Sequence, residues 1–252
     1  MRVITFNLRN HSDRWEERFP LVVQALLAEK ADLIGFQEVS LAMGQLNQAE
    51  QIAEQLNAKL GAPFYTPYLT HCRGELNGRE GIAILSRLPV LAFDEIALPN
   101  IWRVAQKVQV LTGDLPVTFH NTHLHHEPPN DESIRLPQAQ AVLDWMSISE
   151  TPNILTGDMN ASPNSSTIQS YKRVLTSAYE ACHGREPDFT FPTPLTTQGQ
   201  TPNRLAIDYI FFSQGSLQVQ ECHLIGNRQL TADPALYPSD HFGLSANFTF
   251  PK

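Results

Sequence analysis

The segment 153–160, Asn-Ile-Leu-Thr-Gly-Asp-Met-Asn, places a carboxylate and an amide just after a short apolar run. Such a run is typical of a buried strand, so Asp158 and Asn160 are expected where that strand ends. Two other segments follow the same pattern: Asn7 ends RVITFN, and Glu38 ends DLIGFQE. Functional side chains are often presented in this way from a rigid scaffold. The repetition therefore predicts a sheet protein whose polar groups gather at strand ends.

Further acidic residues accompany the strands expected near the C-terminus. Asp208 lies inside the apolar run LAIDYI, and the pair Asp240-His241 directly precedes a final strand at residues 244–250. Burying several carboxylates singly costs much free energy, and a bound divalent cation removes that cost. Oxygen ligands without cysteine favour Mg²⁺ or Mn²⁺ over zinc. Acids, amides and a histidine at strand ends therefore indicate a metal-assisted hydrolytic site.

Each of these features also has an ordinary structural explanation when it is taken alone. An aspartate after glycine, such as Asp158, is usually part of a turn or a cap. An Asp-His pair is usually a satisfied surface link, and a glutamate at a strand end, such as Glu38, is usually solvated. Asp208 is the hardest to explain in this way, because inside an apolar strand it needs a partner, and His241 is a natural one.

The apolar pattern alternates strands and helices and then becomes strand-rich. It predicts helices at residues 20–29, 45–60 and 134–146, with Pro20 in the first turn of the first and an apolar stripe from Leu46 to Leu60 on the second. Strands are predicted at residues 2–7, 32–38, 64–69, 81–85, 104–112, 115–121, 153–156, 205–212, 217–223 and 244–250. Hairpins mixed with strand–helix units predict α/β packing with antiparallel or mixed sheets. The chain has neither GxGxxG nor a Walker loop, so a nucleotide-cofactor fold has no support.

Length and composition limit the class of protein. The 252 residues suit one large domain, and 42% apolar with 17% charged residues indicates a folded globular chain. No apolar run reaches the roughly 18 residues of a membrane span. The lack of a leader pattern after Met1 predicts a cytoplasmic protein, or a secreted one if a leader was removed. Cys72, Cys182 and Cys222 are too scattered for a disulfide framework, and a net charge of −8 argues against a broad grip on nucleic acid.

Taken in order, the motifs resemble those of the endonuclease/exonuclease/phosphatase family of metal-dependent phosphoesterases. The resemblance runs along the whole chain and rests on six short motifs: Asn7 in TFNLR, Glu38 in IGFQEVS, His123 in NTHL, Asp158 and Asn160 in GDMNASP, Asp208 in RLAIDYIF, and Asp240-His241 in PSDHFGL. Trp15 and Arg18 in WEERF and Arg135 in SIRLPQAQ also look like landmarks of bacterial members. The resemblance implies one catalytic domain over residues 1–252, built as a four-layer α/β/β/α sandwich of two mixed β-sheets flanked by helices. The active site would lie at one edge of the sandwich.

The resemblance also implies which residues hold the metal and the attacking water. Glu38 would be the principal ligand of Mg²⁺ or Mn²⁺, with Asn7 shaping the metal site. Asp240 would lie near the metal as a ligand or an outer-sphere partner. Asp158 would activate or orient the water, and Asn160 would hold the nucleophile or a phosphate oxygen.

A second group of residues is implied for the phosphate and the rest of the substrate. His241 would contact the scissile phosphate, with Asp208 fixing its tautomer and favouring its charged form. His123 would be a second phosphate contact, with Glu80 as its partner. Arg135 would bind substrate.

The sequence departs from the family pattern at two places. Met159 stands where the family usually has phenylalanine, a packing change expected to leave the neighbouring acid and amide in place. His125 stands where an aspartate is common. Together with His126, it is expected to be a solvated loop histidine, with a phosphate or metal contact as the alternative.

The substrate is the least determined feature. Members of the family cut DNA, RNA, sphingomyelin and inositol phosphates, and the fold does not choose among them. Specificity is expected in loops at residues 71–80, 98–103, 125–133 and 187–203. No Lys/Arg stripe interleaved with aromatic residues is present, so we expect a small or lipid-like phosphoester, with a DNA or RNA nuclease as the alternative. A catalytically inactive binding module is the least favoured reading, because every expected acid and both phosphate-facing histidines are present.

Overall fold

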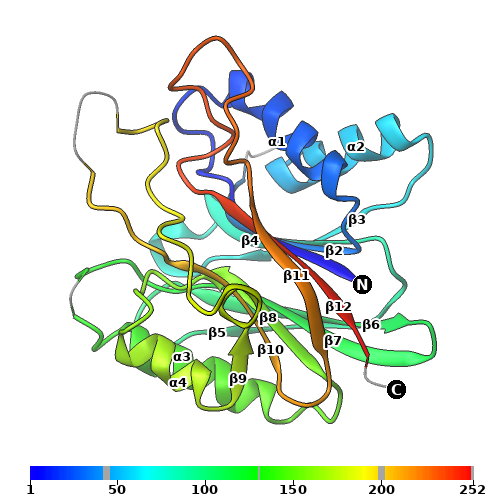
Figure 1. The fold of residues 1–252 in the computed structure, drawn as a ribbon, viewed down its shortest axis with the longest axis vertical. Helices are drawn as coiled ribbons and strands as arrows, with labels where there is room; N and C mark the ends of the chain where they lie inside the picture. Colours follow the sequence, from blue (N-terminus) through cyan, green and yellow to red (C-terminus); the bar gives the residue numbers. More distant parts are fainter. Residues whose placement is uncertain (42–45, 130, 198–201, 251–252) are drawn as a thin grey trace.

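The computed structural model describes residues 1–41, 46–129, 131–197 and 202–250 (Figure 1). Among these residues, two six-stranded sheets form, with the strand orders β11-β12-β1-β2-β4-β3 and β5-β6-β7-β8-β10-β9. The first sheet consists of β1 (Arg2–Asn7), β2 (Leu33–Ser40), β3 (Thr66–His71), β4 (Glu80–Ser86), β11 (Gln218–Ile225) and β12 (Gly243–Thr249). The second consists of β5 (Val90–Ala97), β6 (Val104–Thr112), β7 (Leu115–His123), β8 (Asn153–Asp158), β9 (Leu175–Ser177) and β10 (Asp208–Ser213).

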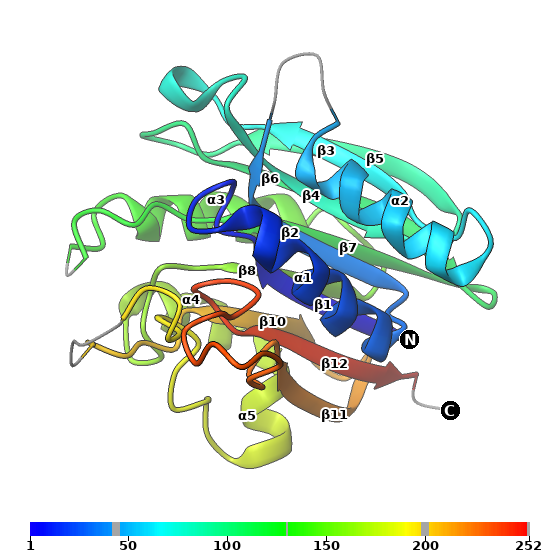
Figure 2. The ribbon, with the colours of Figure 1, turned by 90° about the horizontal axis from the view of Figure 1, so that it is seen from above.

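Helices cover the outer faces of the two sheets. The helices α1 (Trp15–Glu29) and α2 (Gln48–Leu60) pack on the first sheet, and α3 (Arg135–Met146) and α4 (Ser166–Lys172) pack on the second. A short helix, α5 (Ala178–His183), lies against β11 and β10. Figure 1 shows the layers in section, and Figure 2 looks onto α1 and α2 from outside the first sheet. The predicted four-layer α/β/β/α sandwich is confirmed. None of the helices in the described ranges combines the length and apolarity needed to cross a membrane.

Both sheets are mixed because their two central strands run parallel, β1 with β2 and β7 with β8. Parallel neighbours finish at the same edge of a sheet. The register pairs Asn7 with Gln37 in the first sheet and His123 with Asp158 in the second. The carboxyl ends of the central strands therefore gather the motif residues at one rim of the sandwich.

Apolar side chains fill the space between the sheets and the spaces under the helices. The inner layer includes Val3, Leu33, Phe119, Ile210 and Phe248, all fully or almost fully buried. Separate clusters form under α1 and α2 and under α3 and α4.

A buried polar seam joins the two sheets close to the rim. The Asn121 side-chain nitrogen donates to the Phe36 carbonyl across the interface at 2.9 Å, and Gln37 Nε2 donates back to Asn121 Oδ1 at 2.6 Å. Gly35 faces this seam, and a Cβ atom there would lie only 2.5 Å from Thr156 Oγ1 and 2.7 Å from Asn121 Oδ1. The seam therefore fixes the spacing of the sheets where the motif residues meet, because buried donors and acceptors require partners.

The first helix differs from its predicted bounds. α1 begins at Trp15 rather than at residue 20, and Pro20 lies inside it. Pro20 lacks an N–H, so the carbonyl of Glu16 loses its helical partner. Both residues are exposed, and water can satisfy that carbonyl.

The second helix, unlike the first, is shorter than predicted. α2 begins at Gln48 because Asn47 and Glu50 form a capping box, in which each side chain accepts from the other's backbone N–H. Leu46 and Leu60 are 41% and 38% exposed, so the buried stripe is narrower than expected. Gln45, the predicted first residue, lies outside the described residues.

Some elements were missed by the sequence patterns. Four gave too little periodic signal: the edge strand β5, which is largely exposed, and the short elements α4, β9 and α5. β10 begins at Asp208, so residues 205–207 lie outside the strand, and Leu205 forms an isolated bridge to Phe191. The other predicted strand ends differ by no more than two residues. Residue 130 of the loop 125–133 and residues 198–201 of the loop 187–203 lie outside the described part of the chain.

A buried arginine ties together two loops that flank the rim. Arg18, on α1, is fully buried. Its Nη1 donates to the carbonyls of Leu8 and Pro238 at 3.0 and 2.8 Å, and its Nε donates to the carbonyl of Asp13 at 2.7 Å. The loop that follows Asn7 is thereby linked to the loop that precedes Asp240.

A second buried arginine holds another loop. Arg135 donates to the carbonyls of Pro128 and Pro129 at 3.0 and 2.8 Å and to that of His125 at 3.3 Å. The predicted contact between Arg135 and substrate is thus replaced by a structural role, because its guanidinium is committed to backbone carbonyls.

Replacing Gly35 by alanine should destabilise the fold by about 1–3 kcal/mol, because the added methyl group would press the sheets apart at the seam. Urea unfolding measures this change, with the exposed Ser216→Ala as a control that should leave the free energy of unfolding unchanged. A Gly35→Ala protein as stable as the parent would contradict the close approach of the sheets.

Arg18→Met should lower the free energy of unfolding by about 3 kcal/mol or more, because several buried carbonyls lose their donors at once. The exposed Arg79→Met is the matched control and should show no comparable loss in the same thermal and urea melts. Equal stability of the two variants would show that the Arg18 contacts do not hold the loops.

Candidate active site

A cavity of about 320 Å³ opens at the rim where the central strands end. It is lined by most of the motif residues that the sequence predicted: Glu38, His123, Asp158, Asn160, Asp240 and His241. These side chains come from β2, β7, β8 and the segments just after β8 and before β12. The sandwich therefore brings together groups that are far apart in the sequence.

Glu38 reaches the cavity from an irregularity inside β2 and not from the end of the strand as predicted. β2 continues to Ser40, and its register with β4 shifts between Phe36 and Val39. Glu38 itself has a φ of 50°, a left-handed conformation that is uncommon for a residue with a side chain. Bulges of this kind redirect side chains next to active sites. Here the bulge accompanies the turn of Glu38 to the rim.

Asn7 connects the acids of the two sheets. Its side-chain nitrogen donates to Asp158 Oδ2 at 3.0 Å and to Glu38 Oε1 at 3.2 Å. Its side-chain oxygen accepts from the backbone N–H of Arg9 at 2.9 Å. Asn7 is completely buried, so its amide stabilises and spaces the two carboxylates.

Asp158 is the central acid of the site and is almost completely buried. Its Oδ1 accepts from the backbone N–H of Asn160 at 2.9 Å, which leaves Oδ2 facing the cavity side chains. Burial, followed by the neighbouring Asp208 carboxylate, raises the pKa of Asp158 to about 7. The intervening Met159 is buried in the outer core, which fits the packing change expected there.

Asp208 and His241 form the pair that the sequence predicted. The Nδ1 of His241 donates to Asp208 Oδ2 at 2.9 Å, and Nε2 lies 3.8 Å from Asp158 Oδ2. Burial alone would lower the pKa of His241, but Asp208 and Asp158 outweigh it and raise this pKa to about 10. His241 is therefore a cation at neutral pH, with its Nε2 proton available beside Asp158.

His123 has a different partner from the one expected. Arg103 Nη1 lies 2.9 Å from His123 Nδ1 and donates to Glu80 Oε1 at 2.9 Å, so the arginine separates the histidine from the predicted partner Glu80. Burial and the adjacent Arg103 cation hold the pKa of His123 well below its usual value. The Arg103 guanidinium can only donate, so Nδ1 is its acceptor, and Nε2 lies 3.0 Å from the Asn160 side-chain nitrogen and 3.4 Å from Asp158 Oδ2.

Arg103 was not identified from the sequence. It lies at the end of the predicted specificity loop 98–103, just before β6, and is almost completely buried. A buried arginine has to be paired, and the only sequence signal was its position next to a strand that leads into the rim. Its place between Glu80 and His123 makes it part of the site.

Asn160 keeps the place predicted for it. Its φ of 46° suits asparagine, which tolerates the left-handed region better than most residues. Its side-chain nitrogen donates to the Leu124 carbonyl at 3.1 Å and lies 3.0 Å from His123 Nε2. The amide therefore lies at the cavity wall beside His123.

Asp240 is compensated by an arginine that the sequence analysis did not single out. Arg9 Nη1 lies 3.0 Å from Asp240 Oδ2, and Arg9 Nε donates to Asp13 at 2.8 Å. Burial raises the pKa of Asp240, while His241 and Arg9 oppose that rise. Asp240 thus lines the cavity with Arg9 as its direct partner.

The two loop histidines differ from each other. His125 is buried rather than solvated, with its ring against Trp102 at a centroid distance of 5.8 Å. His126 is exposed, as expected for a loop residue, and lines the cavity.

The polar groups of the rim form a continuous row of contacts between alternating partners: Glu80, Arg103, His123, Asp158, His241 and Asp208. The row runs past the carboxylate of Glu38 and the amide of Asn7. Its groups include acids, a cationic imidazole and a neutral one. Such a set can hold a cation, orient water and stabilise a developing negative charge.

Two triads of side chains have ligand atoms close enough together to hold a metal ion: Glu38, His123 and Asp158, and Asp158, Asp208 and His241. In the second triad, the His241 imidazolium already lies between the two carboxylates, with Nδ1 bonded to Asp208 and Nε2 3.8 Å from Asp158. The first triad offers the oxygens of two carboxylates, Glu38 and Asp158. Carboxylate oxygens beside an amide suit a hard divalent cation, so the first triad fits the predicted metal better.

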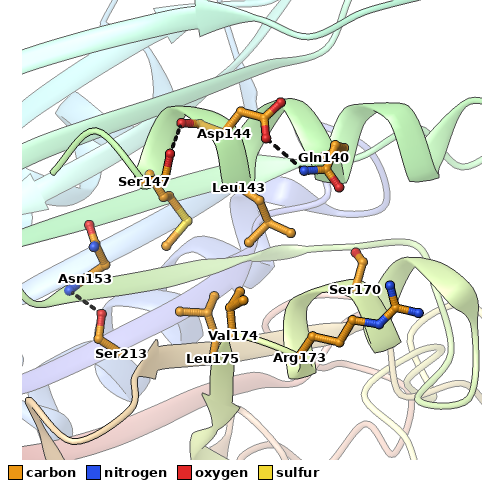
Figure 3. A pocket seen from close by; sticks show the side chains of 11 residues that line it. Gln140, Leu143, Asp144, Ser147, Asn153, Ser170, Arg173, Val174, Leu175 and Ser213 are labelled. Carbon is orange, nitrogen blue, oxygen red and sulfur yellow. Dashed lines mark hydrogen bonds between the residues drawn. The ribbon is translucent and has the colours of Figure 1, made fainter.

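A second cavity, of about 430 Å³, lies on the outer face of the second sheet (Figure 3). Leu143, Val174 and Leu175 point into the gap between α3 and the segment after α4, and Arg173 lies along its edge. Neither histidine nor cysteine lines it, and its acid, Asp144, accepts from Gln140 at 2.8 Å. The residues that line this second cavity lack the grouped acids and imidazoles of the rim. The cavity at the rim is therefore the candidate active site.

Relatives of known sequence share most of this chain. Nocturnin from Xenopus laevis is 28% identical over 266 residues, which cover 94% of this chain and 65% of that protein. A Caenorhabditis elegans protein, named provisionally as a neutral sphingomyelinase, is 24% identical and covers 99% of this chain. This chain spans between 59% and 66% of the length of the curated relatives it matches.

Solved structures share the fold over nearly the whole chain. The Bacteroides thetaiotaomicron mannosyl-6-phosphatase superposes with a TM-score of 0.77 at 20% identity, covering 99% of this chain and 100% of that one. The human Nocturnin catalytic domain superposes with a TM-score of 0.74 at 22% identity, covering 100% of this chain and 94% of that one. The sequence profile described as the Endonuclease/Exonuclease/phosphatase family, whose named activities all break phosphoester bonds, matches residues 4–241. The resemblance seen in the motifs is therefore confirmed, and the chain belongs to the endonuclease/exonuclease/phosphatase family.

Proposed function

We propose that this protein is a divalent metal-dependent hydrolase of phosphoester bonds in which water attacks the phosphorus. The observation that carries the proposal is the row of contacts from Glu80 to Asp208 beside the Glu38 carboxylate, at one rim and around one cavity. Membership of the family supports the reaction class.

The excess of acids at the rim supports a requirement for a cation. Glu38, Asp158 and Asp208 meet there, whereas Arg9 and Arg103 are already paired with Asp240 and Glu80. Glu38 and Asp158, with Asn7 beside them, would hold Mg²⁺ or Mn²⁺. The bound metal would supply Lewis-acid stabilisation of charge on the phosphoryl oxygens.

The protein side chains supply the proton chemistry and the orientation. The carboxylate of Asp158, at the cavity wall, would accept a proton from water during attack. The Nε2–H of the cationic His241 would donate to a phosphoryl oxygen, with Asp208 holding the imidazole in place. The imidazole of His123 and the amide of Asn160 would form a second polar contact with the phosphate on the same side of the cavity.

A small or lipid-like phosphoester fits the site better than duplex DNA does. Binding to DNA depends on lysine and arginine side chains that neutralise successive phosphates. The two arginines that line this cavity are held by acids, and the whole chain carries a net charge of −8. A substrate with one phosphate group at the metal therefore matches the charge of the rim.

Hydrolysis of bis(p-nitrophenyl) phosphate, followed at 405 nm, should require Mg²⁺ or Mn²⁺ and stop on addition of EDTA. Glu38→Gln should raise the metal concentration needed for half-maximal rate by at least tenfold, because a charged ligand is lost. The exposed Glu54→Gln is the matched control. Full activity in EDTA would refute the metal requirement, and nicking of supercoiled plasmid faster than hydrolysis of the small ester would favour the nuclease.

Activity should persist as pH rises until His241 loses its proton at a pH near 10. In Asp208→Asn the carboxylate that raises the pKa of His241 is gone, so the alkaline loss of kcat/KM should begin at a lower pH. The pH profile of kcat/KM at saturating metal tests this shift, with the exposed Asp94→Asn as a control. An unchanged alkaline limb in Asp208→Asn would mean that His241 does not act as the cation.

A further inference from the structure

Two aromatic side chains, Trp102 and Phe191, line the cavity of the candidate active site. Trp102 precedes Arg103, which contacts His123, and the ring of Phe191 lies 4.8 Å from the ring of His241. Both aromatic rings are partly exposed and line the same cavity. Two separate loops therefore each supply an aromatic ring to the cavity wall.

Trp102 is fixed in position relative to the catalytic groups. Its carbonyl accepts from the backbone N–H of Arg73 at 2.8 Å, and its indole packs edge-on against His125 at an interplanar angle of 85°. The neighbouring Arg103 carbonyl accepts from the N–H of Leu98 at 2.8 Å, which closes the loop. A rigid ring presented next to a reactive centre is preorganised for stacking and loses little entropy when a ligand binds.

The indole offers the cavity a ring surface and not a hydrogen-bond donor. Trp102 Nε1 is buried and has no hydrogen-bond partner within the described residues. The part of the side chain that remains accessible is therefore apolar carbon and π surface. Such a surface prefers a flat ring that can stack on it.

Phe191 serves the site in another way. Its ring packs on the imidazole of His241, and its backbone N–H and carbonyl pair with Leu205 at 3.0 and 2.7 Å. The Phe191 ring is therefore held against the imidazole of His241. Trp102 is the partly exposed ring that the other loop supplies to the cavity wall.

The remaining lining does not suit a long alkyl chain. Besides the two rings, Leu76 and Ile207 are the aliphatic side chains among the described residues that line the cavity, and the others are charged or polar. An alkyl chain needs a continuous apolar track, whereas a flat ring needs one face. The wall of the cavity therefore favours a compact ring over a lipid tail.

Building on the proposed function, we infer that Trp102 stacks on the leaving group, and that the substrates are phosphoesters of alcohols that carry an aryl ring or nucleobase close to the ester oxygen. The inference narrows the proposed substrates from small or lipid-like phosphoesters in general to those whose leaving alcohol carries a flat ring. It also makes Trp102, which the sequence motifs did not mark, a residue that determines specificity.

The test compares benzyl phosphate with cyclohexylmethyl phosphate, and their methyl diesters in parallel, in the presence of Mg²⁺ or Mn²⁺. Both alcohols are primary and have the same number of carbons, so they differ mainly in whether the ring is flat. The parent protein should show a kcat/KM about tenfold higher for the benzyl ester, the size expected for one stacking contact. In Trp102→Leu this ratio should fall towards one, and Trp102→Phe should restore most of it. Phe64→Leu, at an exposed aromatic residue outside the cavity, should keep the parent ratio.

The outcomes separate this inference from the proposed function. Equal rates for the two esters in the parent, or equal losses on both in Trp102→Leu, would overturn the stacking role. Faster hydrolysis of decyl phosphate than of the benzyl ester would replace it with a lipid-like leaving group. If no ester is hydrolysed with metal present, the proposed function fails. Calorimetric titration with the two esters then still tests the stacking, because tighter binding of benzyl phosphate that is lost in Trp102→Leu would uphold it and equal binding would refute it.

Discussion

The gathering of acidic side chains at one buried rim is the constraint on which the rest of the structure depends. Glu38, Asp158 and Asp208 come from three strands, and their mutual repulsion would oppose folding if nothing compensated it. The protein compensates with the Asn7 amide between Glu38 and Asp158 and with the His241 imidazolium between Asp158 and Asp208. Further contacts continue the row to Glu80. A divalent cation would complete this balance, so the requirement for metal and the stability of the rim have the same electrostatic origin.

Strand pairing and buried hydrogen bonds, as well as charges, hold the acidic side chains at the rim. Parallel central strands in both sheets bring their carboxyl ends to one edge, and the polar seam around Asn121 sets the distance between those edges. The loops beyond the strands could move, but Arg18 and Arg135 hold them by their carbonyls. A guanidinium suits this work because its donors form a rigid planar array and it stays charged when buried. The two arginines therefore keep the rim in place through their contacts with backbone carbonyls.

The sequence predicted the layers of the fold and most of the acids and histidines of the site, because those features follow from apolar periodicity and from motif order. It could not predict how Glu38 reaches the rim, since the bulge depends on pairing between β2 and β4 and leaves no periodic signal. It also missed Arg9 and Arg103, whose partners Asp240 and Glu80 are distant in the sequence. Arg135 was misassigned because a motif marks that a residue matters without showing whether its side chain faces ligand or backbone.

Asp158 is the residue through which the metal and proton chemistry become coupled. It belongs to both triads of side chains at the rim, with Glu38 and His123 on one side and Asp208 and His241 on the other. Its Oδ1 is committed to the N–H of Asn160, so Oδ2 alone faces Asn7, His123 and His241. Because burial and Asp208 raise the pKa of Asp158 to about 7, a cation bound beside Glu38 would favour the ionised form of this carboxylate. The imidazolium of His241 favours the same ionisation from the other side. A single carboxylate oxygen thus receives the influence of the imidazolium and of the amide, and in the proposed reaction that of the metal as well.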